Sequence, residues 1–406
     1  MNGRSTRLQN RLTALLSLPE SEKESRGLID TPREIFQQPE TWLTTLDRLS
    51  AARPALIEFL DSFLLADPNG QRPGIILTGA GTSDYIGRAV SRILRKQWSC
   101  EVSVVPSTEL LTNMDDFVLP EKSYLLISFS RSGESSEGVA VLEHALERYP
   151  GQISNLVITC NEDGIMARFP GIFPVVLDPR VNDRGLAMTS SFTNMVIAGQ
   201  SLAFVKAPDQ FEGLVRTLAE IGSCRMAEAA EMTAGLAAKG FSRVCFLGTG
   251  ALQAVADESS LKVLELNAGR IATVAQSALG LRHGPMSFVN DETLVVAFLS
   301  GEEQRQKYEL DLLEEMQTKR LGAETFIVTP STTGRIAGLT KNILDLQAPG
   351  DFPDFCRPAV DAIAGQLLGL FCAIENGITP DSPSTGAISR VISHVRIHSS
   401  ANGKLL

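Results

Sequence analysis

Short apolar runs alternate along most of the chain with longer segments in which apolar residues recur at helical spacing. The runs, rich in β-forming residues and bounded by small or polar turn residues, predict strands at 75–78, 102–105, 124–129, 156–159, 175–177, 244–247, 294–299 and 325–328. The intervening segments predict helices, chiefly at 85–97, 138–147, 190–205 and 252–267. This alternation predicts parallel sheets that are covered by helices on both faces.

The first part of the chain has a different pattern. Residues 1–55 are polar and helical in spacing. Thr31, Pro32 and Glu34 stand where a capping box requires them, so we expect a helix that begins there and continues through residues 35–49.

The strand-and-helix pattern occurs twice. An offset of 169 residues superimposes Gly79 and Gly81 on Gly248 and Gly250, and also Phe129 on Phe298. Landmarks that share one offset indicate an internal duplication. The expected fold is therefore α/β, with two tandem doubly wound parallel-sheet domains.

We place these domains at residues 56–222 and 223–383. An N-terminal helical segment, 1–55, precedes them, and a C-terminal tail, 384–406, follows them. Residues 208–238 are expected to form a helical connector.

Composition narrows the class of protein. The chain is 43% hydrophobic and 21% charged, which is typical of a soluble globular protein. Its formal net charge of −10 argues against nucleic acid or an anionic membrane as a partner. An anionic ligand would have to be held locally, by backbone amides and one or two cations.

Cysteine and histidine spacing argues against disulfides and metals. The six cysteines show no C-x-x-C pattern, and the four histidines do not pair with Cys or Glu at ligand spacing. We expect reduced cysteines, a cytoplasmic location and no metal. The longest apolar segment, 363–374, contains Gln366 and is too short to span a bilayer.

A serine-rich turn follows the predicted strand 124–129 and precedes a predicted helix. Ser130, Ser132 and Ser135 supply hydroxyls, and Gly133 allows close backbone approach. The first turn of a helix offers unpaired N–H groups and a positive dipole end, so this turn is suited to a phosphate. The alternative is a serine-capped turn that binds nothing.

The glycine turn before the helix 85–97 offers a second set of hydroxyls, on Thr82 and Ser83. A dinucleotide fingerprint would place its third glycine at Asp84, whose charge would repel a pyrophosphate, so no cofactor is expected. Turns after neighbouring parallel strands open on one crevice, and we expect Thr82 and Ser83 to lie beside the serine turn.

The second copy differs in its chemistry. Where the first copy has the serine cluster, the second has Leu299, Ser300, Gly301 and Glu302, so the cluster of hydroxyls is lost and an acid is gained. Glu258, Lys262 and Glu265 fall on one helical face as acid/base candidates. The alternative is a solvated row of charges.

One histidine in the second copy is a further candidate. His283 lies in a loop between Arg282 and a Gly-Pro turn. A loop histidine beside such backbone-constraining residues is suited to carrying protons.

The motifs at 79–83, 130–135, 185–193, 261–265 and 282–285 together resemble the sugar isomerase (SIS) domain family. Within it, the chain is most similar to the AgaS type, described as galactosamine-6-phosphate deaminase/isomerase or tagatose-6-phosphate ketose/aldose isomerase. The resemblance covers about residues 30–395 and implies flavodoxin-like SIS domains.

The resemblance also implies roles for the residues that match. The hydroxyl and arginine residues bind the substrate phosphate, namely Thr82, Ser83, Ser130, Arg131, Ser132 and Ser135. Glu265 matches the base that moves a proton between C1 and C2, and His283 the histidine that helps open the sugar ring. In related domains this histidine comes from the partner subunit, which implies a homodimer or larger homo-oligomer.

The substrate expected from the resemblance is a phosphorylated amino sugar, with a ketose phosphate as product. One departure concerns a C-terminal lysine that forms a Schiff base in glucosamine-6-phosphate synthase relatives, because the nearest candidate here, Arg390, cannot do so. Ketose amination is therefore disfavoured. Tagatose-6-phosphate isomerisation, glucosamine-6-phosphate deamination and a non-catalytic sugar-phosphate sensor remain as alternatives.

Overall fold

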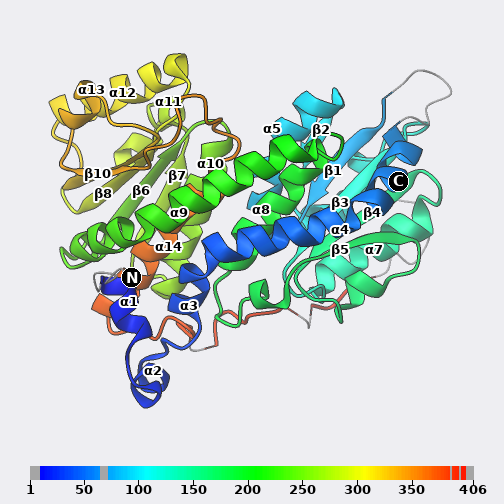
Figure 1. Ribbon diagram of the computed structural model, residues 1–406, viewed down its shortest axis with the longest axis horizontal. Coiled ribbons are helices and arrows are strands. Elements are labelled where there is room, and N and C mark those ends of the chain that lie inside the picture. The colour runs from blue at the N-terminus through cyan, green and yellow to red at the C-terminus, as the bar shows by residue number, and fades with distance from the viewer. Residues whose placement is uncertain (1–9, 65–71, 385, 393–394, 399–406) are drawn as a thin grey trace, which may run out of the picture.

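Two five-stranded parallel sheets form the centre of the computed structural model, which describes residues 10–64, 72–384, 386–392 and 395–398 (Figure 1). The first sheet contains β1 (Gly74–Thr78), β2 (Val102–Val104), β3 (Tyr124–Ser130), β4 (Ile153–Thr159) and β5 (Ile172–Val176). The second contains β6 (Arg243–Gly248), β7 (Ala272–Gln276), β8 (Thr293–Phe298), β9 (Glu324–Thr329) and β10 (Asn342–Asp345).

Both sheets have the same strand order. The first runs β2-β1-β3-β4-β5 and the second, read from its other edge, β7-β6-β8-β9-β10. This is the flavodoxin-like order of a doubly wound sheet. The predicted fold class, two tandem domains of this type related by duplication, is confirmed.

Successive residues of a strand point to opposite faces of the sheet, and here both faces carry apolar side chains. Helices therefore cover both faces of each sheet. Ile75 and Leu77 of β1 belong to one hydrophobic cluster, whereas Ile76 between them belongs to another. Every residue of β1 and β3 is buried, which explains why these strands read as continuous apolar runs.

The long helices are α4 (Gln38–Leu64), α5 (Thr82–Trp98), α7 (Ser136–Arg148), α8 (Ser190–Ala203), α9 (Pro208–Ala237), α10 (Ala251–Leu266), α12 (Glu303–Thr318) and α14 (Pro358–Glu375). The short ones are α1 (Arg11–Leu16), α2 (Glu20–Arg26), α3 (Thr31–Phe36), α6 (Ser107–Asn113), α11 (Ala278–Leu281) and α13 (Gly334–Ala337). In Figure 1, α4 and α9 run beside each other across the molecule.

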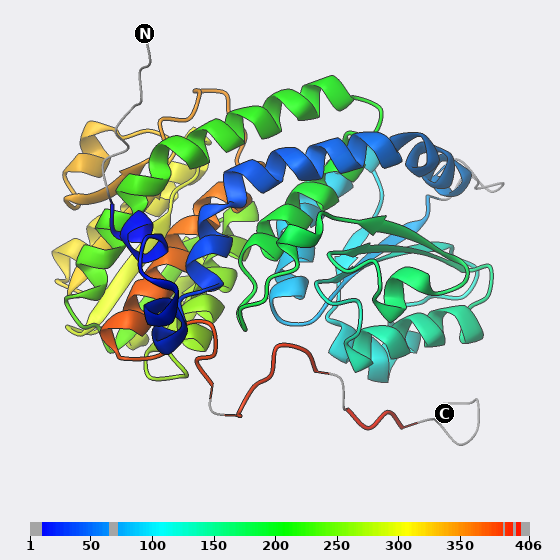
Figure 2. The ribbon, with the colours of Figure 1, turned by 60° about the horizontal axis from the view of Figure 1, so that its bottom comes forward.

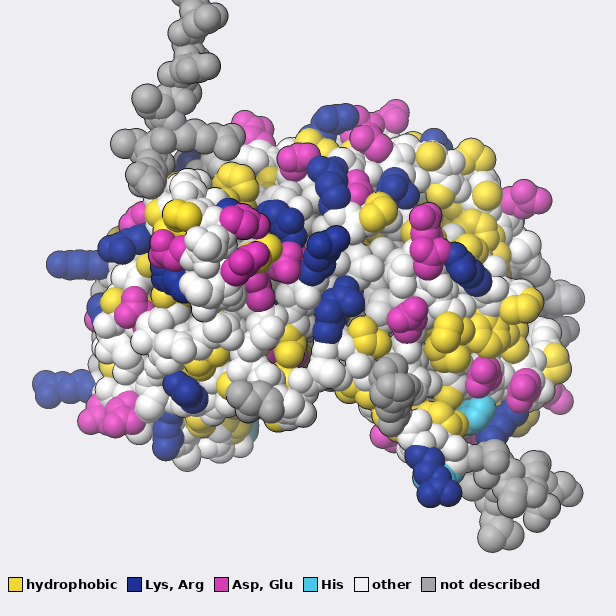
Figure 3. All heavy atoms as spheres, turned by 90° about the horizontal axis from the view of Figure 1, so that it is seen from below, with side chains coloured by type: hydrophobic (Ala, Val, Ile, Leu, Met, Phe, Trp, Pro, Cys, Tyr) yellow, Lys and Arg dark blue, Asp and Glu magenta, His cyan; other side chains and the backbone are white. Residues whose placement is uncertain are grey.

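The two sheets share one core. Residues from the inner faces of both sheets, from α5, α8 and α10, and from α14 belong to a single buried cluster. Helix α14 is apolar and long enough to cross a membrane, but 89% of it is buried inside the protein, as expected of a core helix. Acidic and basic side chains are interspersed over the face shown in Figure 3.

The interface between the halves has approximate twofold symmetry. Helices α5 and α10 pack against each other, and Arg88 of α5 forms a 3.1 Å salt bridge with Asp257 of α10, 169 residues away. This separation equals the repeat offset, so the two residues are equivalent positions that meet at the interface.

Two edge strands, β7 and β10, were not predicted from the sequence. β7 has no fully buried residue, and β10 has one, Leu344. Such half-exposed segments lack the continuous apolar run that marks the central strands.

The predicted capping box at Thr31 is wrong. The short helix α3 begins there, but its N-cap position, Asp30, makes no side-chain cap, and a separate helix, α4, begins at Gln38. The Asp381 carboxylate accepts the N–H groups of Ile29, Asp30 and Thr31 at 2.7–3.1 Å. Glu34 instead accepts the backbone N–H of Arg184 at 2.5 Å.

The division of the chain at residue 222 stays a proposal. Helix α9 runs through this position and connects the two halves.

We expect Asp381→Ala to lower the free energy of unfolding by about 1–2 kcal/mol, because it removes the acceptor for three backbone N–H groups. Urea denaturation followed by circular dichroism measures this loss. The exposed neighbour Ser382 offers a control, since Ser382→Ala should stay within about 0.5 kcal/mol of wild type. Equal stability of both variants would contradict the capping role.

Candidate active site

A cavity of about 370 Å³ lies at the carboxyl ends of β1 and β3. Its lining includes all but one of the predicted site residues, namely Thr82, Ser83, Ser130, Arg131, Ser132, Ser135 and Glu265, and a second acid, Glu137. Thr82 and Ser83 begin α5, the next four extend from the last residue of β3 to the N-cap of α7, and Glu265 lies on α10 of the second half. The structure therefore brings together every predicted site residue except His283.

Two hydroxyls of the serine turn accept hydrogen bonds from backbone N–H groups of the same turn. The Ser130 hydroxyl accepts the N–H of Gly133 at 3.0 Å, and the Ser132 hydroxyl accepts the N–H of Glu134 at 3.2 Å. Because each hydroxyl acts here as an acceptor, its O–H remains available to donate to a ligand oxygen. Gly133 has φ +64°, and a Cβ there would lie 3.2 Å from the Cα of Gly164. A side chain is therefore disfavoured in this turn for both reasons.

Arg131 is buried and its guanidinium is engaged by backbone carbonyls. It donates to Gly185 and Leu186 at 3.3 and 3.1 Å, and also to the carbonyl of Arg390. Burial, and then the nearby Arg390 charge, lower the pKa of Arg131. These hydrogen bonds connect Arg131 to the segment around Gly185 and to the C-terminal tail at Arg390. A contact between Arg131 and a phosphate stays a prediction.

The segment after Asn182 was not predicted as part of the site, yet it forms one wall. Leu186 and Met188 line the cavity. The fully buried Asp183 carboxylate accepts the N–H groups of Thr189 and Ser191 at 2.7 and 2.8 Å, which fixes the turn. A buried acid ahead of hydroxyl residues is a weak sequence signal, because solvated turns contain the same residues.

The C-terminal tail forms another wall. Residues 388–392 line the cavity, and Figure 2 shows the described part of this segment passing along the lower edge of the molecule towards the first half. Arg390 donates to the Asp183 carbonyl and to the Asn182 side chain, each at 2.7 Å. The N–H of Ser136, at the start of α7, donates to the Ile392 carbonyl at 3.0 Å.

The charged row on α10 is buried, so its interpretation as a solvated row is wrong. Lys262 is 1% exposed and Glu258 is 0% exposed, because α10 packs against α5. The Lys262 ammonium donates to Thr82 Oγ1 at 3.0 Å and to Glu265 Oε2 at 2.5 Å, and it lies 3.5 Å from Glu258 Oε1. The lysine thus ties the catalytic candidate of one half to the glycine turn of the other.

Burial dominates the electrostatics of this row. It raises the pKa of Glu258 to about 8, although the Lys262 charge opposes the change. Burial alone would lower the pKa of Lys262, but the carboxylates of Glu258 and Glu265 outweigh it and raise the pKa. Lys262 is therefore charged and compensated by carboxylates. Sequence spacing placed Lys262 and Glu258 on the right face but could not show that this face is buried.

His283 lies apart from the cavity. It is exposed, follows α11 in the second half, and is not among the described residues that line the cavity. Two exposed leucines lie near the predicted catalytic residues in sequence, Leu264 next to Glu265 and Leu279 on α11, with exposed fractions of 40% and 45%.

A family model described as "SIS domain" matches residues 71–205 and 239–370. D-galactosamine-6-phosphate deaminase AgaS of Escherichia coli is 36% identical over 382 residues, which cover 91% of this chain and 95% of the relative. The protein of the same name from a Shewanella species is 30% identical over 380 residues, with 92% of each chain covered.

A solved structure from Escherichia coli, described as tagatose-6-phosphate ketose/aldose isomerase, has a TM-score of 0.80 and 34% sequence identity. The match covers 91% of this chain and 96% of the solved one.

We expect Lys262→Met to lower the free energy of unfolding by about 1–3 kcal/mol, because it removes the hydrogen bonds that the buried ammonium donates to Thr82 and Glu265. The double variant Lys262→Met/Glu265→Gln should lose little more than Lys262→Met alone, because the two residues share one interaction. Urea denaturation of the two variants and wild type tests this coupling. A single variant as stable as wild type would contradict the buried pairing.

Proposed function

Because the chain belongs to the SIS domain family, we infer that it is a sugar-phosphate deaminase/isomerase that converts galactosamine 6-phosphate to tagatose 6-phosphate and ammonia. The observation that carries this proposal is the position of the Glu265 carboxylate, which lines the same cavity as the serine turn. A phosphate anchor and an acid/base group at one cavity are what this reaction requires.

In the proposed mechanism the substrate phosphate lies in the serine turn, at the N-terminus of α7. The hydroxyls of Ser130, Ser132 and Ser135 donate to its oxygens, and Thr82 and Ser83 complete the cradle from the start of α5. Binding at this end of the sugar orients C1 and C2, which are remote from the phosphate, towards the base.

Glu265 then removes the proton from C2 of the open-chain amino sugar, and the C1 carbonyl oxygen gains a proton. The same carboxylic acid returns its proton to C1, which leaves an imine at C2. Water adds to this imine and ammonia leaves, so the product is the 2-keto sugar phosphate. General acid/base steps of this kind contribute about 10² to 10⁴ in rate each.

Lys262 is the positioning residue for this base. Its 2.5 Å hydrogen bond to Glu265 Oε2 fixes one carboxylate oxygen, so the other is free to face the substrate. No step requires a lysine imine, which agrees with Arg390 in the tail, where its side chain binds backbone and Asn182.

The alternatives differ in substrate. A sugar with oxygen at C2 would undergo plain aldose/ketose isomerisation with the same groups, and the solved relative is described as a tagatose-6-phosphate isomerase. Glucosamine 6-phosphate differs from galactosamine 6-phosphate only at C4. A cytoplasmic location is also proposed, because the six cysteines are free and five of them are buried.

We also propose that the active form is a homodimer in which His283 reaches the partner's cavity. Within one chain His283 is exposed and outside the cavity, whereas ring opening requires a proton carrier beside C1. The exposed Leu264 and Leu279 provide apolar surface for such an interface.

Glu265→Gln should lower kcat for ammonia release by about 10² to 10⁴, with KM little changed, because the amide cannot take the C2 proton. Ammonia release is measured with galactosamine and glucosamine 6-phosphates, and tagatose 6-phosphate isomerisation in parallel. Glu375→Gln, at an exposed site, is the matched control. Full activity of Glu265→Gln would refute the base assignment, and wild-type binding without turnover of any sugar would favour the sensor.

Co-expression of Glu265→Gln and His283→Asn chains tests the dimer. Each variant alone should be inactive, but hybrids contain one complete site. About one quarter of wild-type specific activity is expected, since half the dimers are hybrid and half their sites are intact. Absence of complementation would contradict sharing of His283 between subunits.

A further inference from the structure

The glycine turns of the two halves have the same backbone geometry. Gly81 has φ 57° and ψ −125°, and Gly250 has φ 72° and ψ −128°. Each is the N-cap of a long helix, α5 or α10, and makes no side-chain cap. Together with the Arg88–Asp257 contact, this shows that the approximate twofold symmetry extends to the carboxyl edges of both sheets.

Across this symmetry, each helix presents one side chain to the other's glycine turn. The position that a Cβ would occupy at Gly81 is 3.9 Å from Leu261 Cδ2 of α10. The corresponding position at Gly250 is 3.0 Å from Arg92 Nη1 of α5. Arg92 and Leu261 differ by the repeat offset, so an arginine stands at the second turn where a leucine stands at the first.

The same offset relates Glu265 to Lys96, an exposed residue of α5. The proposed base on α10 of the second half therefore corresponds to a lysine on α5 of the first half. Substitution of a base by a cation removes proton abstraction from the second edge, while the positive charge that it adds favours an anion.

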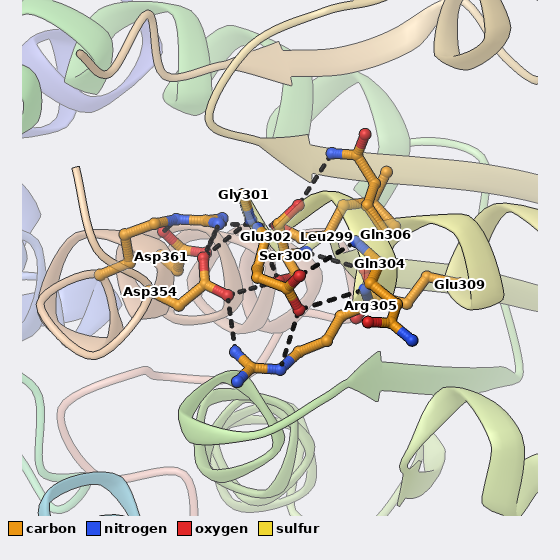
Figure 4. Close-up of polar contacts among 11 residues, drawn as sticks. Leu299, Ser300, Gly301, Glu302, Gln304, Arg305, Gln306, Glu309, Asp354 and Asp361 are labelled. Carbon is orange, nitrogen blue, oxygen red and sulfur yellow. Dashed lines mark hydrogen bonds and ion pairs between the residues drawn. The ribbon is translucent and has the colours of Figure 1, made fainter. Parts of the chain in front are cut away.

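The loop after β8 does not repeat the serine cradle, because the chain's own carboxylates take its donors (Figure 4). Glu302 accepts the N–H groups of Gln304 and Arg305 at 3.1 and 3.3 Å. Asp354 accepts the N–H of Gly301 at 2.8 Å and the hydroxyl of Ser300. Any ligand at this edge must therefore be held at the glycine turn.

Two guanidinium groups converge on that turn. The Cβ position at Gly250 that lies 3.0 Å from Arg92 Nη1 is also 3.9 Å from Arg305 Nη1. Arg305 bridges Glu302 and Asp354 at 3.5 Å each, whereas Arg92 forms no salt bridge or side-chain hydrogen bond with the described part of the chain. Arg92 is exposed at its surface side, and partial burial together with the neighbouring Arg305 charge lowers its pKa.

We propose that the carboxyl edge of the second sheet is a second, non-catalytic binding site for a small phosphate-bearing anion, which Arg92 and Arg305 hold beside Gly250. The phosphate would lie at the switch point between β6 and β8, where ligands of doubly wound sheets bind. It would supply the counter-charge that Arg92 lacks and would meet the N-terminus of α10, which has no side-chain cap.

Equilibrium dialysis with radiolabelled inorganic phosphate at low ionic strength counts the sites directly, because screening by salt is then weak. We expect two phosphates per wild-type chain and one per Arg92→Ala chain. Arg95→Ala is the matched control, since this exposed residue of the same helix has the same charge, and its charge acts on Glu101. It should keep two sites.

A further variant separates this proposal from the proposed function. Ser132→Ala weakens the serine turn and should remove the other phosphate, while the site at Arg92 remains. One phosphate per wild-type chain, or two in Arg92→Ala, would overturn the second site without touching the first. The phosphate that Arg92→Ala still binds shows that this variant is folded.

Discussion

Packing of α5 against α10 places a charged lysine, Lys262, in a fully buried position between the two halves of the chain. A buried ammonium is tolerated only with nearby carboxylates and a hydrogen-bond acceptor, and it finds these in Glu258, Glu265 and Thr82. Thr82 begins α5 in the first half, whereas both acids lie on α10. Separation of α5 and α10 would therefore break the hydrogen bond between Lys262 and Thr82 and leave the ammonium without this partner. The geometry of the cavity depends on this contact between the two helices.

Duplication explains why the two edges of this interface differ in chemistry. Because the halves are related by an approximate twofold axis, the glycine turn of each half packs against a helix of the other half. The residues on that helix determine the chemistry at the carboxyl edge of the sheet. The first turn meets Leu261 and the row that ends at Glu265, so the proposed base lies there, hydrogen-bonded to a lysine. The second turn meets Arg92, and its neighbouring loop is filled by Glu302 and Asp354. One backbone arrangement thus supports a proposed reaction at one edge and only charge binding at the other.

The sequence was informative where burial leaves a continuous apolar run. β1, β3 and β8 are buried along their whole length and were predicted within one or two residues, but the half-exposed edge strands β7 and β10 were not predicted. The hydroxyl turns of the cavity could be predicted because parallel neighbours open on the same edge. The buried state of Lys262 could not, since charges spaced three and four apart look alike on a solvated and on a packed face.

Long-range contacts were also beyond reach of the sequence. The N-terminus of α3 is capped by Asp381, about 350 positions away along the chain, so a local capping motif gave the wrong partner. The same holds for the tail, where Arg390 reaches the Asn182–Asp183 turn. These side chains form hydrogen bonds with groups that are close in space but distant in the sequence. Which groups become close is determined by the packing of the core, so sequence spacing does not reveal it.

The acidic net charge of the chain is consistent with a phosphate site of this design. Around the cavity the cations are satisfied by the protein itself, Arg131 and Arg390 by backbone carbonyls and Lys262 by two carboxylates. In the proposed site, the serine turn offers a phosphate neutral, directional donors, namely its hydroxyls and the N-terminus of α7, while a contact of Arg131 with the phosphate stays a prediction. Such donors fix the orientation of a ligand more strictly than a mobile surface charge does. In a reaction that moves a proton between adjacent carbons, this orientation matters more than raw affinity.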